Sequence, residues 1–163
     1  MRHTRKLLSL TAVMLLAACT DNSLTNPFQN AVGTYQLTVY AGKSIPATYV
    51  IQPGADPNYP NGATFVVNDG NLVLNNNGTF IETNNYTTTP NGGSAQQSSF
   101  VSSGTWTGSG TTISLSAPQQ NGNAPRNVSG TLTFDSSRNV YVLDYQESNG
   151  VGGFDSFEYQ SPR

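Results

Sequence analysis

Four carboxylates near the C-terminus are the residues of this chain best suited to general acid–base chemistry. They are Asp144, Glu147, Asp155 and Glu158. A pair of carboxylates can hydrolyse a glycoside when one protonates the leaving oxygen and the other acts as base or nucleophile. Spacing in sequence sets no spacing in space, however, and acidic residues mostly lie on protein surfaces, where they keep the chain soluble. The sequence therefore predicts surface carboxylates and no enzyme activity.

The chain contains few residues that could bind a metal or act as a nucleophile. His3 and Cys19 are the single histidine and the single cysteine of the chain, and both lie near its start. Once a leader is removed, no histidine remains for a triad, a haem or an ordinary zinc site. Segments 135–139 and 56–58 lack the Asp/Asn alternation, the glycine and the distal glutamate of a calcium loop. We expect Asx turns there, and neither a metal nor a cofactor.

Cys19 follows a segment with the pattern of a secretion signal. Three basic residues precede an apolar run, residues 7–18, which is too short to cross a bilayer. The run ends in Leu16-Ala17-Ala18-Cys19, which resembles a bacterial lipobox. That resemblance implies cleavage before Cys19 and its acylation, with chains such as palmitate that each contribute ~0.8 kcal/mol of membrane binding per buried CH₂. An ordinary signal peptide with an incidental cysteine is the alternative.

This signal sets the expected domain organisation. Residues 1–18 are predicted to be a lipoprotein signal peptide, residues 19–31 the lipidated cysteine and a polar tether, and residues 32–163 one domain. Thr20 follows Cys19 where aspartate would retain many lipoproteins in the inner membrane. By analogy with such sorting rules we expect a cell-envelope protein anchored in the outer membrane through Cys19.

Charge excludes one class of partner. The signal contains three of the seven basic residues and none of the nine acidic ones, which leaves four bases against nine acids. Those bases are Lys43, Arg126, Arg138 and Arg163, and they are scattered along the chain. Because nucleic-acid binding depends on clustered positive charge, we expect no nucleic-acid partner. The sequence names no protein partner.

The elements that would position any site are β-strands. Residues 69–116 contain two hairpins of alternating apolar residues. In the first, a three-residue loop with Gly78 in the left-handed conformation places Leu74 opposite Phe80. A two-residue loop would place Leu74 opposite Ile81 and exchange the two faces of the partner strand. We expect the first register, which puts Phe80 inside and turns Glu82 toward the barrel end.

The second hairpin contains a glycine beside a bulky ring. Phe100, Gly104 and Trp106 share the inner face, opposite Ile113 and Leu115 across a turn at 108–110. The same Gly-Thr-large unit recurs at residues 33–35, 78–80, 104–106 and 130–132. A glycine two residues from a ring lets a strand bend where a sheet closes. Chance recurrence in a chain rich in glycine and threonine is the alternative.

Further strands are expected on both sides of these hairpins. They are Gly33–Tyr40, Ala47–Ile51, Ala63–Asn68, Asn127–Phe134, Asn139–Tyr145 and Phe154–Gln160. Even succession with Gly/Asn turns favours an antiparallel up-and-down β-barrel of roughly eight to ten strands, with a β-sandwich as the alternative. Segments 85–98 and 117–126 are poor in apolar residues, so we expect mobile loops at the barrel mouths.

The order of these segments resembles a known family. GTYQLTVYAGKSIPA, DGNLVLNNNGTF, SSGTWTGSGTTISLS and NVSGTLTF, within residues 32–145, resemble the lipocalin-like domains of small bacterial lipoproteins. The resemblance implies a lipocalin-like barrel and transfers no catalytic or binding residue.

Two functions remain open at this point. In a binding module, inward aromatic rings would line a site for a small hydrophobic ligand. Those rings are Tyr35, Phe65, Phe80, Phe100, Trp106 and Phe134. In a structural or interaction lipoprotein, the same rings would fill the core and no small molecule would bind. A cavity on the order of several hundred Å³ would favour the binder.

Overall fold

The computed structural model describes residues 31–118, 125–148 and 153–161, and this part of the chain forms one ten-stranded antiparallel sheet. The strands are β1 Gly33–Tyr40, β2 Lys43–Ser44, β3 Ala47–Ile51, β4 Ala63–Leu74, β5 Thr79–Pro90, β6 Gln96–Ser109, β7 Thr112–Ala117, β8 Arg126–Asp135, β9 Val140–Ser148 and β10 Phe154–Gln160. Among the described residues no helix is long and apolar enough to cross a membrane.

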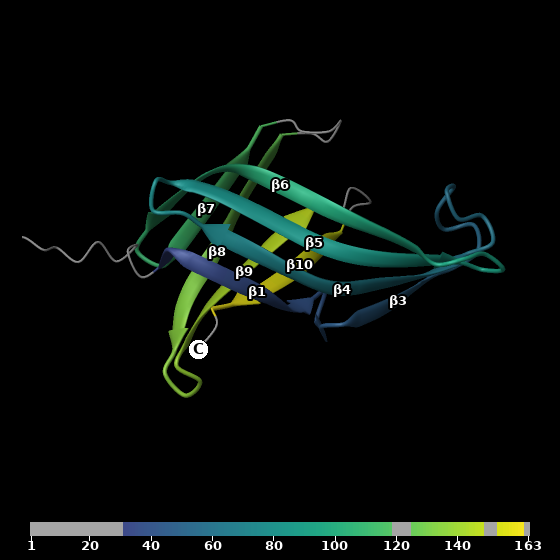
Figure 1. Ribbon diagram of the computed structural model, residues 1–163, viewed down its shortest axis with the longest axis horizontal. Helices are drawn as coiled ribbons and strands as arrows, with labels where there is room; N and C mark the ends of the chain where they lie inside the picture. The colour runs from purple at the N-terminus through teal and green to yellow at the C-terminus, as the bar shows by residue number, and fades with distance from the viewer. Residues whose placement is uncertain (1–30, 119–124, 149–152, 162–163) are drawn as a thin grey trace, which may run out of the picture.

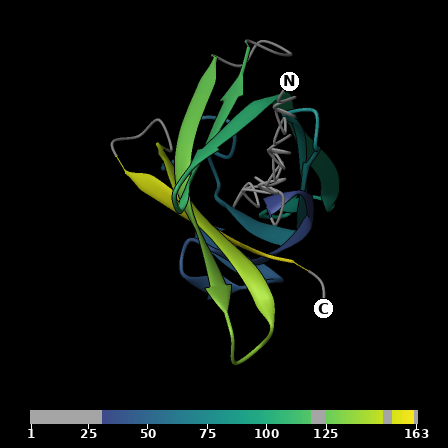
Figure 2. The ribbon, with the colours of Figure 1, turned by 90° about the vertical axis from the view of Figure 1, so that its left-hand side faces the viewer.

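The sheet closes on itself to form a barrel. β1 pairs with β10 on one side and with β4 on the other, so eight strands form a ring, while β2 and β3 extend from it. β4, β5 and β6 continue past the ring, and β3 lies along β4 (Figure 1). The β8–β9 hairpin also projects beyond the barrel (Figure 2). The predicted lipocalin-like barrel is confirmed, and the sandwich alternative is wrong because one sheet supplies all the strands.

The register of the central hairpin is the expected one. Leu74 pairs with Phe80, and Gly78 has φ 79°, the left-handed conformation that the three-residue loop requires. In the next hairpin Trp106 pairs with Leu115, also as expected. Its turn is shorter than predicted, however, because Ser109 pairs with Thr112. Two residues therefore connect these strands.

Gly104 allows a close approach between β6 and β7. A Cβ atom at this position would lie 2.0 Å from the carbonyl oxygen of Ser116, far inside van der Waals contact. A Cβ atom at Gly130 would lie 2.6 Å from the carbonyl oxygen of Asp144. Both glycines therefore allow the backbone of a neighbouring strand to approach closely.

The expected loop at 85–98 is mostly strand, which corrects the prediction. β5 continues to Pro90, β6 begins at Gln96, and Thr88 pairs with Gln96. The segment is polar, but both its neighbours supply backbone hydrogen-bond partners and its threonines suit a pleated surface. The expected loop at 117–126 is shortened because Ala117 pairs with Arg126, and residues 119–124 lie outside the described part.

The barrel interior is apolar toward one end. Six side chains that are almost completely buried define this half, namely Tyr35, Leu72, Leu74, Phe80, Ile113 and Leu143. Ala31 is also buried, and its carbonyl oxygen accepts a hydrogen bond of 2.8 Å from the hydroxyl of Tyr35. Ala31 therefore packs with the core of the barrel.

A candidate ligand site at the seam of the barrel

The barrel wall opens beside the first half of β6. β6 pairs with β5 from Gln96 to Thr105, but its pairing with β7 covers Thr105–Ser109. The first half of β6 therefore extends past the end of β7 and faces the ends of β7, β8 and β9 across a gap. We call this gap the seam.

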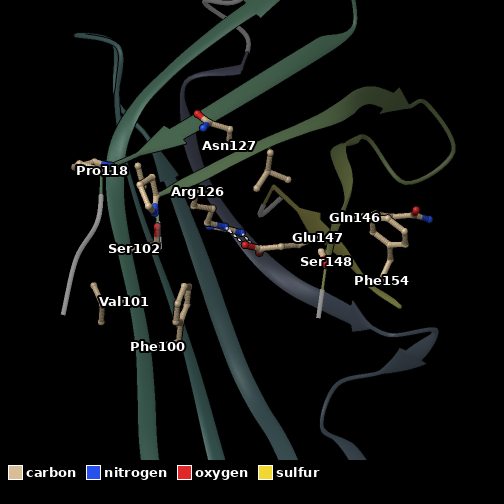
Figure 3. Close-up of a pocket in the computed structure, with 13 residues that line it drawn as sticks. Phe100, Val101, Ser102, Pro118, Arg126, Asn127, Gln146, Glu147, Ser148 and Phe154 are labelled. Atoms are coloured by element: carbon tan, nitrogen blue, oxygen red, sulfur yellow. Dashed lines mark hydrogen bonds and ion pairs between the residues drawn. The ribbon is translucent and has the colours of Figure 1, made fainter. Parts of the chain in front are cut away.

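A pocket of about 600 Å³, the seam pocket, lies in this gap (Figure 3). Its lining includes Phe100 of β6, Val128 of β8 and Phe154 at the start of β10. Arg126 is the only basic residue and Glu147 the only acidic one among the described residues that line it. A more open depression of about 730 Å³ shares Ala117 and Pro118, but none of its described lining residues is charged. The seam pocket therefore combines apolar surface with charge.

A buried glutamate holds the floor of the pocket together. Glu82 has no exposed surface, and its carboxylate accepts hydrogen bonds from four side chains. These are Arg126, through Nη1, the hydroxyl of Tyr145 at 2.5 Å, the hydroxyl of Tyr159 at 2.6 Å and the amide of Asn84 at 2.9 Å. A carboxylate removed from water needs this degree of compensation.

Arg126 connects this buried group to the pocket. Its Nε donates to Oε1 of Glu147 at 2.8 Å, and its Nη2 lies 2.8 Å from Oε2 of the same carboxylate. Nη2 also donates to the hydroxyl of Tyr145 at 2.9 Å. Burial alone would lower the pKa of Arg126, but Glu82 first, and then Tyr145 and Glu147, raise it above its ordinary value. The guanidinium is therefore a fixed positive charge.

Glu147 is the charged group that an entering molecule meets. Its side chain is 31% exposed, whereas that of Arg126 is 7% exposed and lies beneath it. Asp155 pairs directly with Glu147 across β9 and β10, and its carboxylate accepts a hydrogen bond of 2.6 Å from Tyr40. Carboxylates therefore outnumber the single guanidinium around the inner end of the seam.

The tyrosines of the interior are held in their protonated form. Burial, followed by the charge of Glu82, raises the pKa of Tyr86 to about 12, and burial raises that of Tyr35 to about 12. Burial also raises the pKa values of Tyr145 and Tyr159 well above the ordinary value of 10. The hydroxyls of Tyr145 and Tyr159 are therefore stable donors to Glu82.

The six aromatic residues predicted to line a ligand site do not share one pocket, although Tyr35, Phe80 and Trp106 belong to one core cluster and Phe65 packs against it. Phe100 lines the seam pocket. Tyr35, Phe80 and Trp106 are buried in the core, and Nε1 of Trp106 donates to the carbonyl oxygen of Asn75 at 2.8 Å. Phe65 stacks on Tyr86 with ring centroids 5.2 Å apart.

Phe134 corrects the prediction. It is 48% exposed and packs against Tyr141, with ring centroids 5.0 Å apart, at the end of the projecting β8–β9 hairpin. Phe134 has the same strand parity as Val128, as predicted, but the barrel ends before this position, so no opposite wall covers the ring. Cys19, the predicted lipidation site, lies outside the described residues.

The four C-terminal carboxylates form two cross-strand pairs. Asp144 pairs with Glu158, while Glu147 pairs with Asp155. Asp144 alternates with buried Tyr145 and therefore faces outward, as predicted. Glu147 has the inward parity and is ion-paired with Arg126, which corrects its assignment as a solubilising charge. No cluster of three potential metal ligands occurs within residues 31–118, 125–148 and 153–161.

Sequence reasoning missed Glu82, Arg126 and Phe154 as site residues. Glu82 has the parity of Phe80, and Arg126 has that of Val128, so both side chains were due to point inward. The sequence therefore contained one indication of this site, namely two residues of opposite charge at inward-facing positions of different strands. Nothing in the sequence indicates that Phe154 lies beside the pocket, because its position depends on where β10 begins.

Comparisons with protein-family models, with curated proteins and with solved structures find no match to this chain.

Proposed function

We propose that this protein is a lipid-anchored lipoprotein of the cell envelope whose barrel binds a small amphipathic molecule in the seam pocket. The observation that supports this most is the pocket itself, about 600 Å³ in volume, with exposed aromatic surface above a buried, ion-paired floor. Ligand sites commonly combine apolar walls with a few fixed polar groups. The lipocalin-like resemblance of the sequence agrees with such a role.

The proposed ligand site lies at the seam and not at the barrel centre. Tyr35, Phe80 and Trp106 pack in the core, as the alternative of a structural protein with a filled interior requires. The seam pocket favours binding over that alternative, since a purely structural barrel has no need of a charged group at the base of an opening. Binding is also favoured over catalysis, because Glu147 is engaged by Arg126 and Asp155 by Tyr40.

Phe154 provides the test of this site. It is 70% exposed, so we expect Phe154→Ala to leave the fold intact and to weaken binding of a neutral probe, 1-octanol, about threefold to tenfold through loss of aromatic contact. Phe134→Ala is the matched control, because Phe134 is also exposed and lies on the β8–β9 hairpin. Isothermal titration calorimetry of the three proteins measures the difference. Equal affinities in all three would place the ligand elsewhere.

Anchoring has a separate test. Cys19→Ala removes the sulfur that the lipobox resemblance marks for acylation. We expect most of the protein to move from the membrane fraction to the soluble fraction, or to retain its signal peptide, because no second acyl chain would hold the domain. Mass spectrometry of the wild-type N-terminus should show an acylated Cys19. An unmodified wild-type cysteine would contradict the lipoprotein assignment.

A further inference from the structure

We propose that the seam pocket selects a cationic amphiphile, an amine with an apolar chain or ring, over a fatty acid of the same size. This inference rests on the proposed function and adds the charge of the ligand. It follows from the way the hydrogen-bond donors of Arg126 are used and from the balance of charge around them.

Most hydrogen-bond donors of Arg126 are already engaged and cannot bind an anion. A guanidinium has five N–H donors. One N–H of Nη1 donates to Glu82, one of Nη2 donates to Tyr145, and Nε and Nη2 both contact the carboxylate of Glu147. These contacts use four of the five N–H groups, so a carboxylate that paired with the guanidinium through two N–H groups would have to displace Glu147, which would leave the carboxylate of Glu147 unpaired beside the new one. A fatty acid gains no new donor in this exchange.

The charge balance favours a cation. Two carboxylates, Glu82 and Glu147, contact one guanidinium, so this cluster carries a net negative charge. Asp155, opposite Glu147 on β10, adds to it. Glu82 is completely buried and already accepts from Tyr145, Tyr159 and Asn84, whereas the side chain of Glu147 remains 31% exposed. The acceptor that a ligand can reach is therefore the carboxylate of Glu147.

The walls of the pocket suit the rest of such a ligand. Phe100 lies on the side of the pocket where Arg126 lies, and Phe154 lies beside Gln146 at the outer edge of the pocket (Figure 3). The guanidinium of Arg126 already lies 5.8 Å from the ring centre of Phe100, as expected where the negative face of a ring meets a cation. An ammonium group bonded to Glu147 would have the ring of Phe100 on the Arg126 side, while its apolar chain packs on Val128, Pro118 and Pro125.

Three probes with the same chain separate the possibilities, namely octylamine, 1-octanol and octanoate at pH 7. We expect octylamine to bind most tightly and octanoate at least about tenfold more weakly, by calorimetry. Glu147→Gln keeps an acceptor oxygen but removes the charge, and it should lower the affinity for octylamine about tenfold while changing that for octanol little. Glu158→Gln, the same change on the outer face, should preserve the preference for the amine.

The outcomes distinguish this inference from the proposed function. Octanoate binding as tightly as octylamine would overturn the inference and leave a binding pocket in place. Failure of all three probes to bind would overturn the proposed function as well. If Glu147→Gln does not fold, the wild-type protein still decides the matter. Its affinity for octylamine should fall as salt concentration rises while its affinity for octanol does not, and equal salt dependence would contradict the inference.

Discussion

Replacing Glu82 with alanine is expected to lower the free energy of unfolding by about 3–5 kcal/mol. The substitution leaves the charge of Arg126 at the base of the pocket with only the partly exposed Glu147, and it removes the acceptor used by Tyr145 and Tyr159. An uncompensated buried charge costs more than the lost contacts themselves. Urea denaturation followed by the emission of Trp106, which is buried in the folded state, measures the change.

A double variant separates the missing charge from the missing volume. Glu82→Leu together with Arg126→Leu removes both charges, so it should be more stable than Glu82→Leu alone, because a buried ion pair replaced by apolar side chains is often close to neutral. Glu158→Ala, a glutamate on the outer face, should cost less than about 1 kcal/mol. A cost below about 1 kcal/mol for Glu82→Ala would mean that Glu82 is not the centre of a buried network.

Alkaline pH is expected to destabilise the protein steeply, beginning near pH 10. Tyr35, Tyr86, Tyr145 and Tyr159 have folded-state pKa values raised above the ordinary value of 10, with Tyr35 and Tyr86 at about 12. Their contribution is therefore fully present below pH 10 and is lost as the pH rises through the folded values. Each tyrosine that is ionised only when unfolded lowers stability by about 1.4 kcal/mol per pH unit.

Urea unfolding at intervals from pH 8 to pH 12 measures this loss. Tyr159→Phe removes one titrating group, so its stability should fall less steeply above pH 10 than that of the wild-type protein, although its stability at pH 8 is lower because Glu82 loses a donor. A free energy of unfolding that stays level between pH 9 and pH 11.5 would show that these hydroxyls are not held protonated by burial.

The strands were predictable because one face of the barrel wall is exposed to solvent and the other is buried, so polar and apolar residues alternate along each strand. Alternation placed Leu74 opposite Phe80 and Trp106 opposite Leu115, and glycine at position 78 fixed the loop. Alternation fails where both faces are polar, so the continuation of β5 to Pro90 was missed. It fails also where the partner wall ends, which is why Phe134 was placed inside.

The site was less predictable than the fold. Glu82 and Arg126 are 44 residues apart in sequence, and their pairing depends on β5 and β8 facing each other across the interior. A single charged residue at an inward position does not show which residue it pairs with. That becomes clear only when the strands close into a ring. The seam is also a tertiary property, because it arises from the different lengths of β6 and β7.

Occupation of the seam pocket by a small amphipathic cation is tested most directly by a nuclear magnetic resonance titration of the isotope-labelled protein with octylamine. We expect saturable shifts for the amides of Val101, Val128 and Glu147, which line the pocket. The amides of Val50 on β3 and Phe134 on the β8–β9 hairpin should not move. Shifts that do not saturate, or that spread over the outer face around Asp144 and Glu158 while the pocket residues stay unchanged, would contradict binding of the cation in the seam pocket.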